Sequence, residues 1–286
     1  MQTGWRWLWG VAWCLFGGLA EAQALSARIQ AVQPPAWLER AKQRQPLALG
    51  TALESADLIH TGDGGRVELA LAEGSRIQLG EHAHFKLAYL PKSPQNAQPF
   101  KANLSVLKGA FRFTTGVVGK SQPRDIQIQV ATVTAGIRGT DVWGKSDAEN
   151  DVVCLLEGQI QVQHLTETPL AMDQPLSFFV APKGQAALPI AAVDPHKVNT
   201  VWLPQTTLPN EALSEAGTYR LTVLAGLAEQ DAQRWFRRLQ AAGYPVAIVP
   251  SQNAALRDIQ LSGFVDAAHA KIALQRLQAA FSIPKQ

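Results

Sequence analysis

Apolar and polar residues alternate with a period of two through much of residues 26–192. Because successive side chains of a strand point to opposite faces, this alternation predicts half-buried β-strands. Glycine-bearing turn signals separate the runs, as at residues 61–65 and 72–75. The predicted strands are residues 27–32, 58–59, 66–71, 76–79, 84–90, 103–108, 126–134, 152–156, 160–164 and 176–180. Short strands at this spacing predict a mainly β domain, built as a sandwich, a barrel-like roll or a β-helix.

A glycine-containing corner interrupts the alternation within residues 130–163, VATVTAGIRGTDVWGKSDAENDVVCLLEGQIQVQ. We interpret Gly136, Arg138, Gly139 and Thr140 as a structural turn motif. Gly139 is expected to take a positive φ or to allow a close approach of another chain segment. We expect the Arg138 guanidinium to pair with a carboxylate or with backbone carbonyls, and Thr140 to cap the same turn.

The pattern changes to a helical period in residues 218–286. Apolar residues at three-to-four spacing predict one helix at residues 230–242 and a second that ends before Pro284. The remaining alternating runs predict strands at residues 219–224, 245–249 and 258–261. This order, βαββα, predicts a small α+β domain of the split βαβ type, with both helices on one face of the sheet and the other face open.

Three prolines mark the segment between these two regions. Pro195, Pro204 and Pro209 are expected to interrupt any regular element in residues 193–217, so the sequence predicts a linker here. A linker of this length predicts two domains that engage separate targets together.

The N-terminus has the features of an export signal. Arg6 precedes an apolar stretch at residues 7–20, and Ala20, Glu21 and Ala22 form a small-x-small cleavage site. The sequence therefore predicts a cleavable signal peptide over residues 1–22, with an uncleaved anchor as the alternative. We expect a periplasmic protein without a membrane span in the mature chain.

Charge and candidate chemistry point away from catalysis and from nucleic acids. Charged residues make up 17% of the chain and the formal net charge is +3, which argues against nucleic acid as the main partner. No Gly-x-Ser-x-Gly elbow occurs, and Cys154 is expected to be a small buried hydrophobe. His82 and His84 are expected on one strand face near His60, without a third ligand at metal-site spacing. We therefore expect no enzyme, catalytic residue, cofactor or metal site; a hydrolase with paired carboxylates is the minor alternative.

The open face of the predicted α+β sheet holds the candidate binding residues. If the apolar residues of its strands face the helices, the polar ones between them face outward. Such groups can hydrogen-bond the hydroxyl and acetamido groups of a glycan. The candidate glycan-binding residues are Arg220, Thr222, Asp258 and Gln260; a solvated face without a ligand is the alternative.

The β-rich region resembles the FecR-type domain over residues 26–165. The family's turn motifs occur here in the same order. They lie at Thr61 and Gly62, at Gly74 and Ser75, and at residues 137–140, and the EGQIQV strand follows them. The resemblance implies a domain of the bacterial envelope, often the exported part of iron-uptake signalling proteins that act on sigma factors. A periplasmic sensing module is therefore one expectation for this chain.

The C-terminal region resembles a SPOR domain. The similarity lies in the first strand, in LQAAGY at residues 239–244 and in IQLSGF at residues 259–264. This resemblance implies binding to peptidoglycan glycan strands at sites of cell division. Together the two resemblances predict a non-enzymatic envelope protein whose C-terminal domain binds peptidoglycan while the β domain meets an unknown protein partner or ligand.

Overall fold

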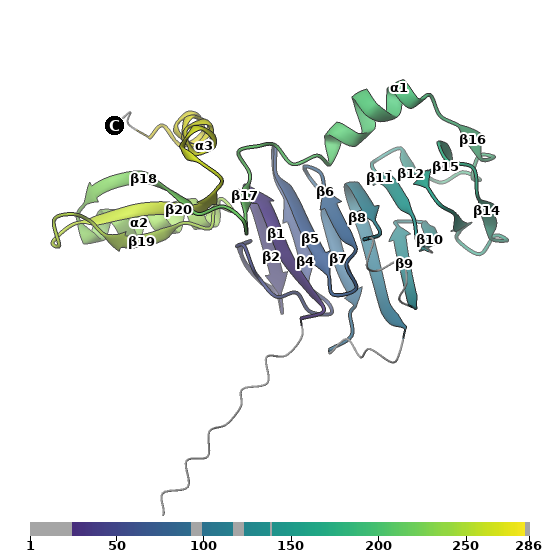
Figure 1. Ribbon diagram of the computed structural model, residues 1–286, viewed down its shortest axis with the longest axis horizontal. Helices are drawn as coiled ribbons and strands as arrows, with labels where there is room; N and C mark the ends of the chain where they lie inside the picture. The colour runs from purple at the N-terminus through teal and green to yellow at the C-terminus, as the bar shows by residue number, and fades with distance from the viewer. Residues whose placement is uncertain (1–24, 93–98, 117–122, 138, 284–286) are drawn as a thin grey trace, which may run out of the picture.

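The computed structural model describes residues 25–92, 99–116, 123–137 and 139–283. Within them the chain is mainly β, with a small α+β part at the C-terminal end, as the periodicity predicts (Figure 1). The predicted signal peptide and Arg138 lie outside the described residues. No helix in the described part of the chain is long and apolar enough to cross a membrane.

In the described residues, strands β1 to β16 form the larger unit, which we call the β unit, and β17 pairs with its strand β1. Several of them, including β5 and β13, begin and end where the alternation of apolar residues begins and ends. The strands are β1 (Ala27–Gln33), β2 (Ala36–Arg40), β3 (Gln43–Pro46), β4 (Leu58–Thr61), β5 (Arg66–Leu71), β6 (Arg76–Leu79), β7 (His84–Tyr89), β8 (Phe100–Thr114), β9 (Arg124–Val130), β10 (Val133–Ile137), β11 (Asp141–Ser146), β12 (Asn150–Glu157), β13 (Ile160–His164), β14 (Leu170–Met172), β15 (Ser177–Pro182) and β16 (Ala191–Ala192).

Strand β8 joins two sheets. Its first half pairs with β7 and in parallel with β9, whereas its second half pairs antiparallel with β6 and β11. Gly109 lies between the halves at φ +89°, and an added Cβ would lie 2.6 Å from Ala83 Cα. Only glycine tolerates that backbone and that approach. One apolar core, with members such as Phe85, Phe111 and Ile128 fully buried, serves both sheets.

Residues 126–134, predicted as one strand, are instead two strands joined by a turn. β9 ends at Val130 and β10 begins at Val133, with Ala131 between them at φ +44°. Asp151 fixes this turn, because its carboxylate accepts hydrogen bonds from the backbone N and the hydroxyl of Thr132, at 3.1 and 2.6 Å. The turn depends on a residue distant in sequence and carries neither glycine nor proline, so the local pattern did not reveal it.

Residues 193–217 are not the free tether that the prolines suggested. They form α1 (Pro195–Lys197), a π-helical turn (Val198–Trp202), a 3-10 turn (Leu203–Gln205) and β17 (Leu213–Ser214), which pairs with β1. Figure 1 shows this helical segment over the β unit. Trp202 stacks on Trp143, with ring centroids 4.8 Å apart. Proline is compatible with the first turn of a helix, and apolar contact with the sheet holds the segment in place.

The C-terminal part, which we call the α+β unit, has the predicted order of elements. They are β18 (Tyr219–Leu227), α2 (Glu229–Ala241), β19 (Ala247–Pro250), β20 (Arg257–Phe264) and α3 (Ala267–Phe281). The sheet order is β18-β20-β19, and both neighbouring pairs are antiparallel. Val223, Ile259 and Leu277 are among the buried members of its core.

Candidate functional site

The polar face of the α+β sheet carries the four residues predicted to bind a ligand. Leu221 and Ile259 are buried in the core with the helices, so the side chains at alternate positions face away from it. Arg220 is exposed, and Thr222, Asp258 and Gln260 are half-buried. The structure therefore places polar groups on an accessible sheet face.

Two of these side chains interact, and a third has a structural contact. Thr222 and Gln260 are direct cross-strand neighbours, and the Gln260 amide donates to the Thr222 hydroxyl at 3.4 Å. Asp258 accepts a hydrogen bond from the backbone N of Gly226 at 2.9 Å, which supports the bend where Gly226 has φ +67°. Asp258 is therefore engaged in backbone structure, whereas Arg220 and the second N–H and the carbonyl of the Gln260 amide remain available.

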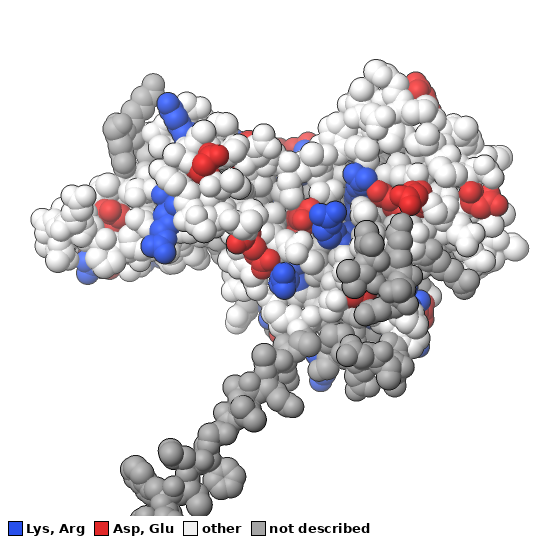
Figure 2. Space-filling view, in the orientation of Figure 1, with Lys and Arg blue, Asp and Glu red and all other residues white. Residues whose placement is uncertain are grey.

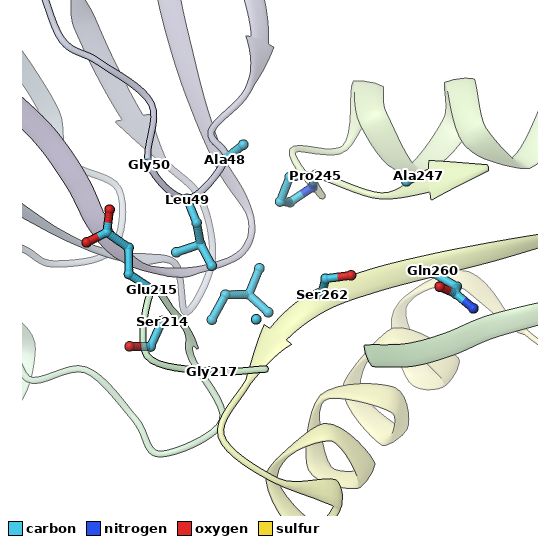
Figure 3. A pocket seen from close by; sticks show the side chains of 12 residues that line it. Ala48, Leu49, Gly50, Ser214, Glu215, Gly217, Pro245, Ala247, Gln260 and Ser262 are labelled. Carbon is cyan, nitrogen blue, oxygen red and sulfur yellow. The ribbon is translucent and has the colours of Figure 1, made fainter. Parts of the chain in front are cut away.

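A groove lies where this face meets the β unit, and we call it the junction groove. It is open to solvent and has a volume of about 700 Å³, within the range of small-molecule sites. Figure 3 shows Leu49 of the β unit opposite Ser262 and Gln260 of β20. Its lining comes from four segments of the chain: Ala48, Leu49, Gly50, Leu213, Ser214, Glu215, Gly217, Pro245, Ala247, Gln260, Ser262 and Gly263.

Gln260 is the one predicted site residue among those lining the groove; Arg220, Thr222 and Asp258 lie elsewhere on the sheet. Ser262 is exposed on the same strand as Gln260, whereas the Leu49 loop was not among the predicted site residues. That loop carries no polar cluster or motif, and only the packing of the two units brings it to the sheet. No local signal in the sequence could have found it.

Specific contacts hold the two units together around the groove. The backbone N of Ala36 donates to the Gly243 carbonyl at 3.1 Å, and Leu49 packs against the cores of both units. Arg276 of α3 pairs with Glu211 at 2.9 Å. These contacts fix the shape of the groove, because its walls come from both units.

Charge around the groove is mixed. Glu215 lines the groove and pairs with Arg28 at 3.3 Å. On the face drawn in Figure 2, basic and acidic side chains are interspersed and most of the surface is uncharged. This face therefore favours a ligand recognised by hydrogen bonds over one held by a strong field of a single sign.

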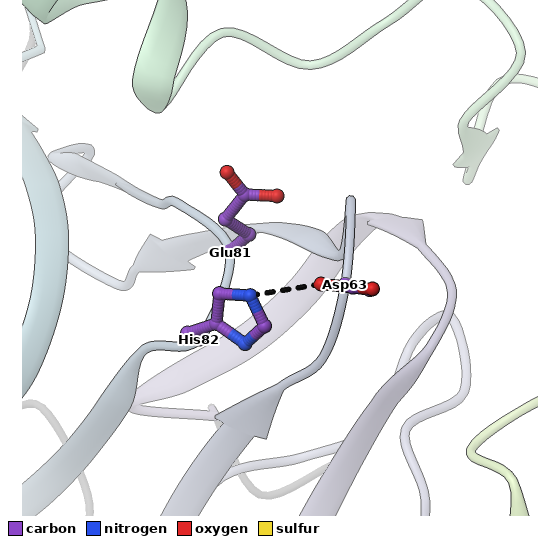
Figure 4. A group of neighbouring side chains, drawn as sticks. All are labelled: Asp63, Glu81 and His82. Carbon is purple, nitrogen blue, oxygen red and sulfur yellow. Dashed lines mark ion pairs between the residues drawn. The ribbon is translucent and has the colours of Figure 1, made fainter.

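A second polar cluster contains Asp63, Glu81 and His82, whose ligand atoms all lie within 4.8 Å of one another (Figure 4). His82 pairs with Asp63 at 2.9 Å, and Glu81 accepts from the backbone N of Gly64 at 2.9 Å. Two carboxylates and an imidazole are compatible with a divalent cation. All three residues are exposed, and the ion pair alone accounts for their proximity.

The predicted shared face of His82 and His84 is wrong. His82 lies in a turn at φ +53°, before β7 begins, whereas His84 is in the strand. His84 instead meets the edge of the His60 ring, with centroids 4.7 Å apart. Burial, followed by the nearby His60, lowers the pKa of His84 below its usual value.

The predicted turn motif has a different construction from the one expected. Gly139 has φ +74°, as its position suggested, but Gly136 lies within β10 with nothing within 4 Å of an added Cβ. Thr140 does not cap the turn with its own hydroxyl, which has no hydrogen-bond partner in the described chain. Instead, the Thr115 hydroxyl accepts from the backbone N of Thr140 at 3.1 Å.

Residues 57–161 match the FecR protein family. The match runs from β4 to the start of β13, within the range where the sequence resemblance lies, and it includes both the turn motif and the cluster around His82. All the residues that line the junction groove lie outside the match.

Other comparisons add little to the FecR match. No curated protein matches this chain. Two crystal structures of a candidate anti-sigma factor from Parabacteroides distasonis align with 80% of this chain and 93% of their own, at 14% and 13% identity and a TM-score of 0.42. A TM-score this low assigns no function to this protein.

Cys154 lies within the residues that match the FecR family and is buried in the β unit. Burial raises the pKa of the Cys154 thiol to about 12, so the thiol is not ionised at neutral pH and lacks nucleophilic character.

Arg112 and Asp141 form a partly buried charged pair. Asp141 accepts two hydrogen bonds from Arg112, at 2.9 and 2.6 Å. Such a bidentate pair between neighbouring strands stabilises the sheet.

Proposed function

We propose that this protein is a non-enzymatic sensing module of the bacterial cell envelope. The observation that carries the proposal is the FecR family match over residues 57–161, together with the envelope signalling role that the resemblance implies. In this proposal the protein is exported to the periplasm and the FecR domain presents its surface to a protein partner.

The junction groove supports a mechanism for sensing. A ligand in the groove contacts Leu49 of the β unit and Ser262 of the α+β unit at once. Its binding energy therefore favours the arrangement in which both walls are in place. The position of the α+β unit relative to the β unit would then depend on the ligand, and a partner bound to the β unit would detect that change.

The mechanism is tested by the distance between the units. Spin labels at Lys86→Cys and Gln275→Cys, both exposed positions, report the separation of β7 and α3. Solubilised glycan strands are the first ligand to add. We expect a narrower distance distribution when they bind; binding that leaves the distribution unchanged would contradict sensing at the junction.

Peptidoglycan binding by the α+β unit is the second candidate function. Its support is the polar sheet face on which Arg220, Thr222 and Gln260 remain accessible, together with the resemblance to SPOR domains. On this view Gln260 and Arg220 donate to glycan hydroxyl and acetamido oxygens. The α+β unit would then localise the protein on the wall, at sites of cell division.

Pelleting of the full chain with purified sacculi tests this candidate. Thr222→Ala and Gln260→Ala should each reduce the bound fraction several-fold, whereas Gln275→Ala on α3 serves as a matched control and should not. Equal pelleting of all four proteins would remove these residues from the site. Release of soluble muropeptides during the incubation would instead support the hydrolase alternative.

Export has a separate test. We propose that residues 1–22 are a cleavable signal peptide, and a fusion of residues 1–25 to alkaline phosphatase should be active only if it reaches an oxidising compartment. An inactive fusion, with a control signal active in parallel, would contradict the periplasmic assignment. Retention of the active fusion in the membrane fraction would favour the uncleaved anchor.

A further inference from the structure

Uncharged polar side chains form rows across the outer face of one sheet in the β unit. Strands β8, β9, β10, β13 and β14 are neighbours in that sheet. The strand registers give two adjacent rows: Asn103, Gln127, Gly136, Gln161 and Ala171 in one, and Ser105, Gln129, Thr134 and Gln163 in the other. Neither row contains a charged residue.

Gly136 makes a gap in the first row. Gln127 and Gln161 flank it on the neighbouring strands, and both are exposed. β9 and β13 lie on either side of β10, so they are two interstrand distances apart, or about 10 Å. One sugar ring fits between two amides at that separation. No atom of the described residues lies within 4 Å of a Cβ added to Gly136, so among them the space above it is open.

The gap belongs to a cavity of about 600 Å³. Gln127, Gly136 and Gln161 line it, and the exposed carboxylates of Asp125 and Asp173 lie at its margin. This volume lies within the range of ligand sites in proteins. We call it the amide trough.

The amides beside Gly136 differ from those in the adjacent row. Gln129 donates to the Ala131 carbonyl at 3.0 Å and Gln163 donates to the Glu167 carbonyl at 2.9 Å, so both are used within the protein. In the described part of the chain, the side chains of Gln127 and Gln161 make no such bond. Among the described residues, their donors and acceptors are therefore free beside the gap at Gly136.

We infer that the amide trough is a binding site for a neutral, hydroxyl-rich polysaccharide. Each amide of Gln127 and Gln161 offers both a donor and an acceptor, which matches a sugar hydroxyl that also does both. The carboxylates of Asp125 and Asp173 accept hydrogen bonds only, which suits further hydroxyl groups. Gly136 leaves the backbone accessible to the ring between them.

The charge of the trough selects against acidic polymers. Asp125 and Asp173 are exposed at its margin, and they would repel a uronate or phosphate chain. Arg124 also lines the trough, but its side chain is only 6% exposed and pairs with Glu73 at 3.4 Å. Lys101 lies opposite Asp125 on β8, beyond both rows. With two exposed carboxylates against these cations, we expect the trough to prefer an uncharged chain.

Titration of the full chain with neutral hexasaccharides tests the inference. The probes are a β-1,4-linked N-acetylglucosamine hexamer and a β-1,4-linked glucose hexamer, with polygalacturonate as the anionic comparison. We expect at least one neutral hexamer to bind and polygalacturonate to bind at least tenfold more weakly. Failure of both neutral hexamers at millimolar concentration, or preferential binding of polygalacturonate, would overturn the inference.

The decisive variant is Gly136→Thr, which fills the gap. A β-branched residue suits a strand, and the added atoms enter open space, so the fold is expected to persist. Hexamer affinity should fall at least tenfold, with a similar loss in the double variant Gln127→Ala and Gln161→Ala. Gln129→Ala, from the same strand and face, is the matched control and should retain affinity within twofold; unchanged binding by Gly136→Thr would overturn the inference.

This inference goes beyond the proposed function and does not depend on it. The trough lies on β9, β10 and β13, whereas the junction groove and the Gln260 face involve the α+β unit. Gln260→Ala should therefore leave hexamer binding at the trough intact, and Gly136→Thr should leave the distance between the spin labels intact. Each proposal can fail without the other.

Discussion

The indole Nε1 of Trp37 donates a hydrogen bond to the carbonyl oxygen of Ala241 at 3.2 Å, across 204 residues of sequence. Trp37 lies on β2 at the edge of the β unit, and Ala241 is the last residue of α2. The bond uses a carbonyl at the helix end that has no partner within the helix. It ties the α+β unit to the β unit beside the junction groove.

Gly243 makes this contact sterically possible, so Gly243→Ala should loosen the junction. Gly243 has φ +83°, and an added Cβ would lie 2.6 Å from the Trp37 ring. We expect the free energy of unfolding to fall by about 2–3 kcal/mol, from backbone strain plus the clash. Urea denaturation followed by Trp fluorescence measures the change.

A matched glycine separates these two contributions. Gly226 has φ +67°, but the nearest atom to its added Cβ is Leu256 Cδ1 at 3.9 Å. Gly226→Ala should therefore lower the free energy of unfolding only by the cost of the backbone strain, about 1–2 kcal/mol. Equal losses in the two variants would mean that the Trp37 contact does not constrain the junction.

Trp202→Ala should release the helical segment from the β unit. The Trp202 ring stacks on Trp143 and meets the edge of Phe178, and it is 9% exposed. Truncation of a buried tryptophan costs about 3–5 kcal/mol. Proteolysis within residues 193–217 should become faster, as followed by mass spectrometry. Val201→Ala, from a residue that is 50% exposed, should change neither quantity appreciably.

The buried Asp151 carboxylate makes stability fall at low pH. Burial raises its pKa, but hydrogen bonds from Lys183, Thr132 and Ser146 outweigh burial, so the pKa lies below its usual value. Its stabilising contribution is complete above the unfolded-state pKa of about 3.9 and is lost as the pH falls through the lower folded-state value. The free energy of unfolding should therefore decline as the pH drops below about 4.

Asp151→Asn provides the comparison for that pH dependence. Removing the charge leaves Lys183 without its partner, so the free energy of unfolding near neutral pH should fall by about 3 kcal/mol. This value is at the lower end for a buried ion pair because Lys183 is 33% exposed. The loss should shrink as the pH falls below about 4. A difference between the two proteins that stays constant down to pH 2 would contradict this role for Asp151.

Cys154 should resist alkylation in the folded protein. With a pKa of about 12 and no exposed surface, its thiol is neither ionised nor accessible at pH 8. Iodoacetamide should label the peptide that carries Cys154 at least a hundredfold more slowly in buffer than in 6 M guanidinium chloride. Rapid labelling in buffer would reveal an opening of the sheet that the folded structure does not contain.

Local pattern determined much of the strand layout. Residues 66–71 and 160–164 alternate cleanly between turn signals, and β5 and β13 occupy those positions. Residues 126–134 differ: the alternation predicted one strand there, but the chain forms two strands, β9 and β10, joined by a turn. The turn after Val130 depends on Asp151, which no local pattern connects to it.

By itself the sequence determined a mainly β region followed by a small α+β unit. The strand period of two and the helical spacing of three to four can both be recognised from residues that are neighbours in the chain. It also placed Gln260 and its neighbours on a polar strand face, since alternation decides which side chains face away from a core. Only tertiary structure decided that residues 193–217 pack on the β unit, that Leu49 faces Ser262, and that Gln127 and Gln161 flank the gap at Gly136. These relationships join residues from separate strands, and sheet register and the burial of apolar surface set them in three dimensions.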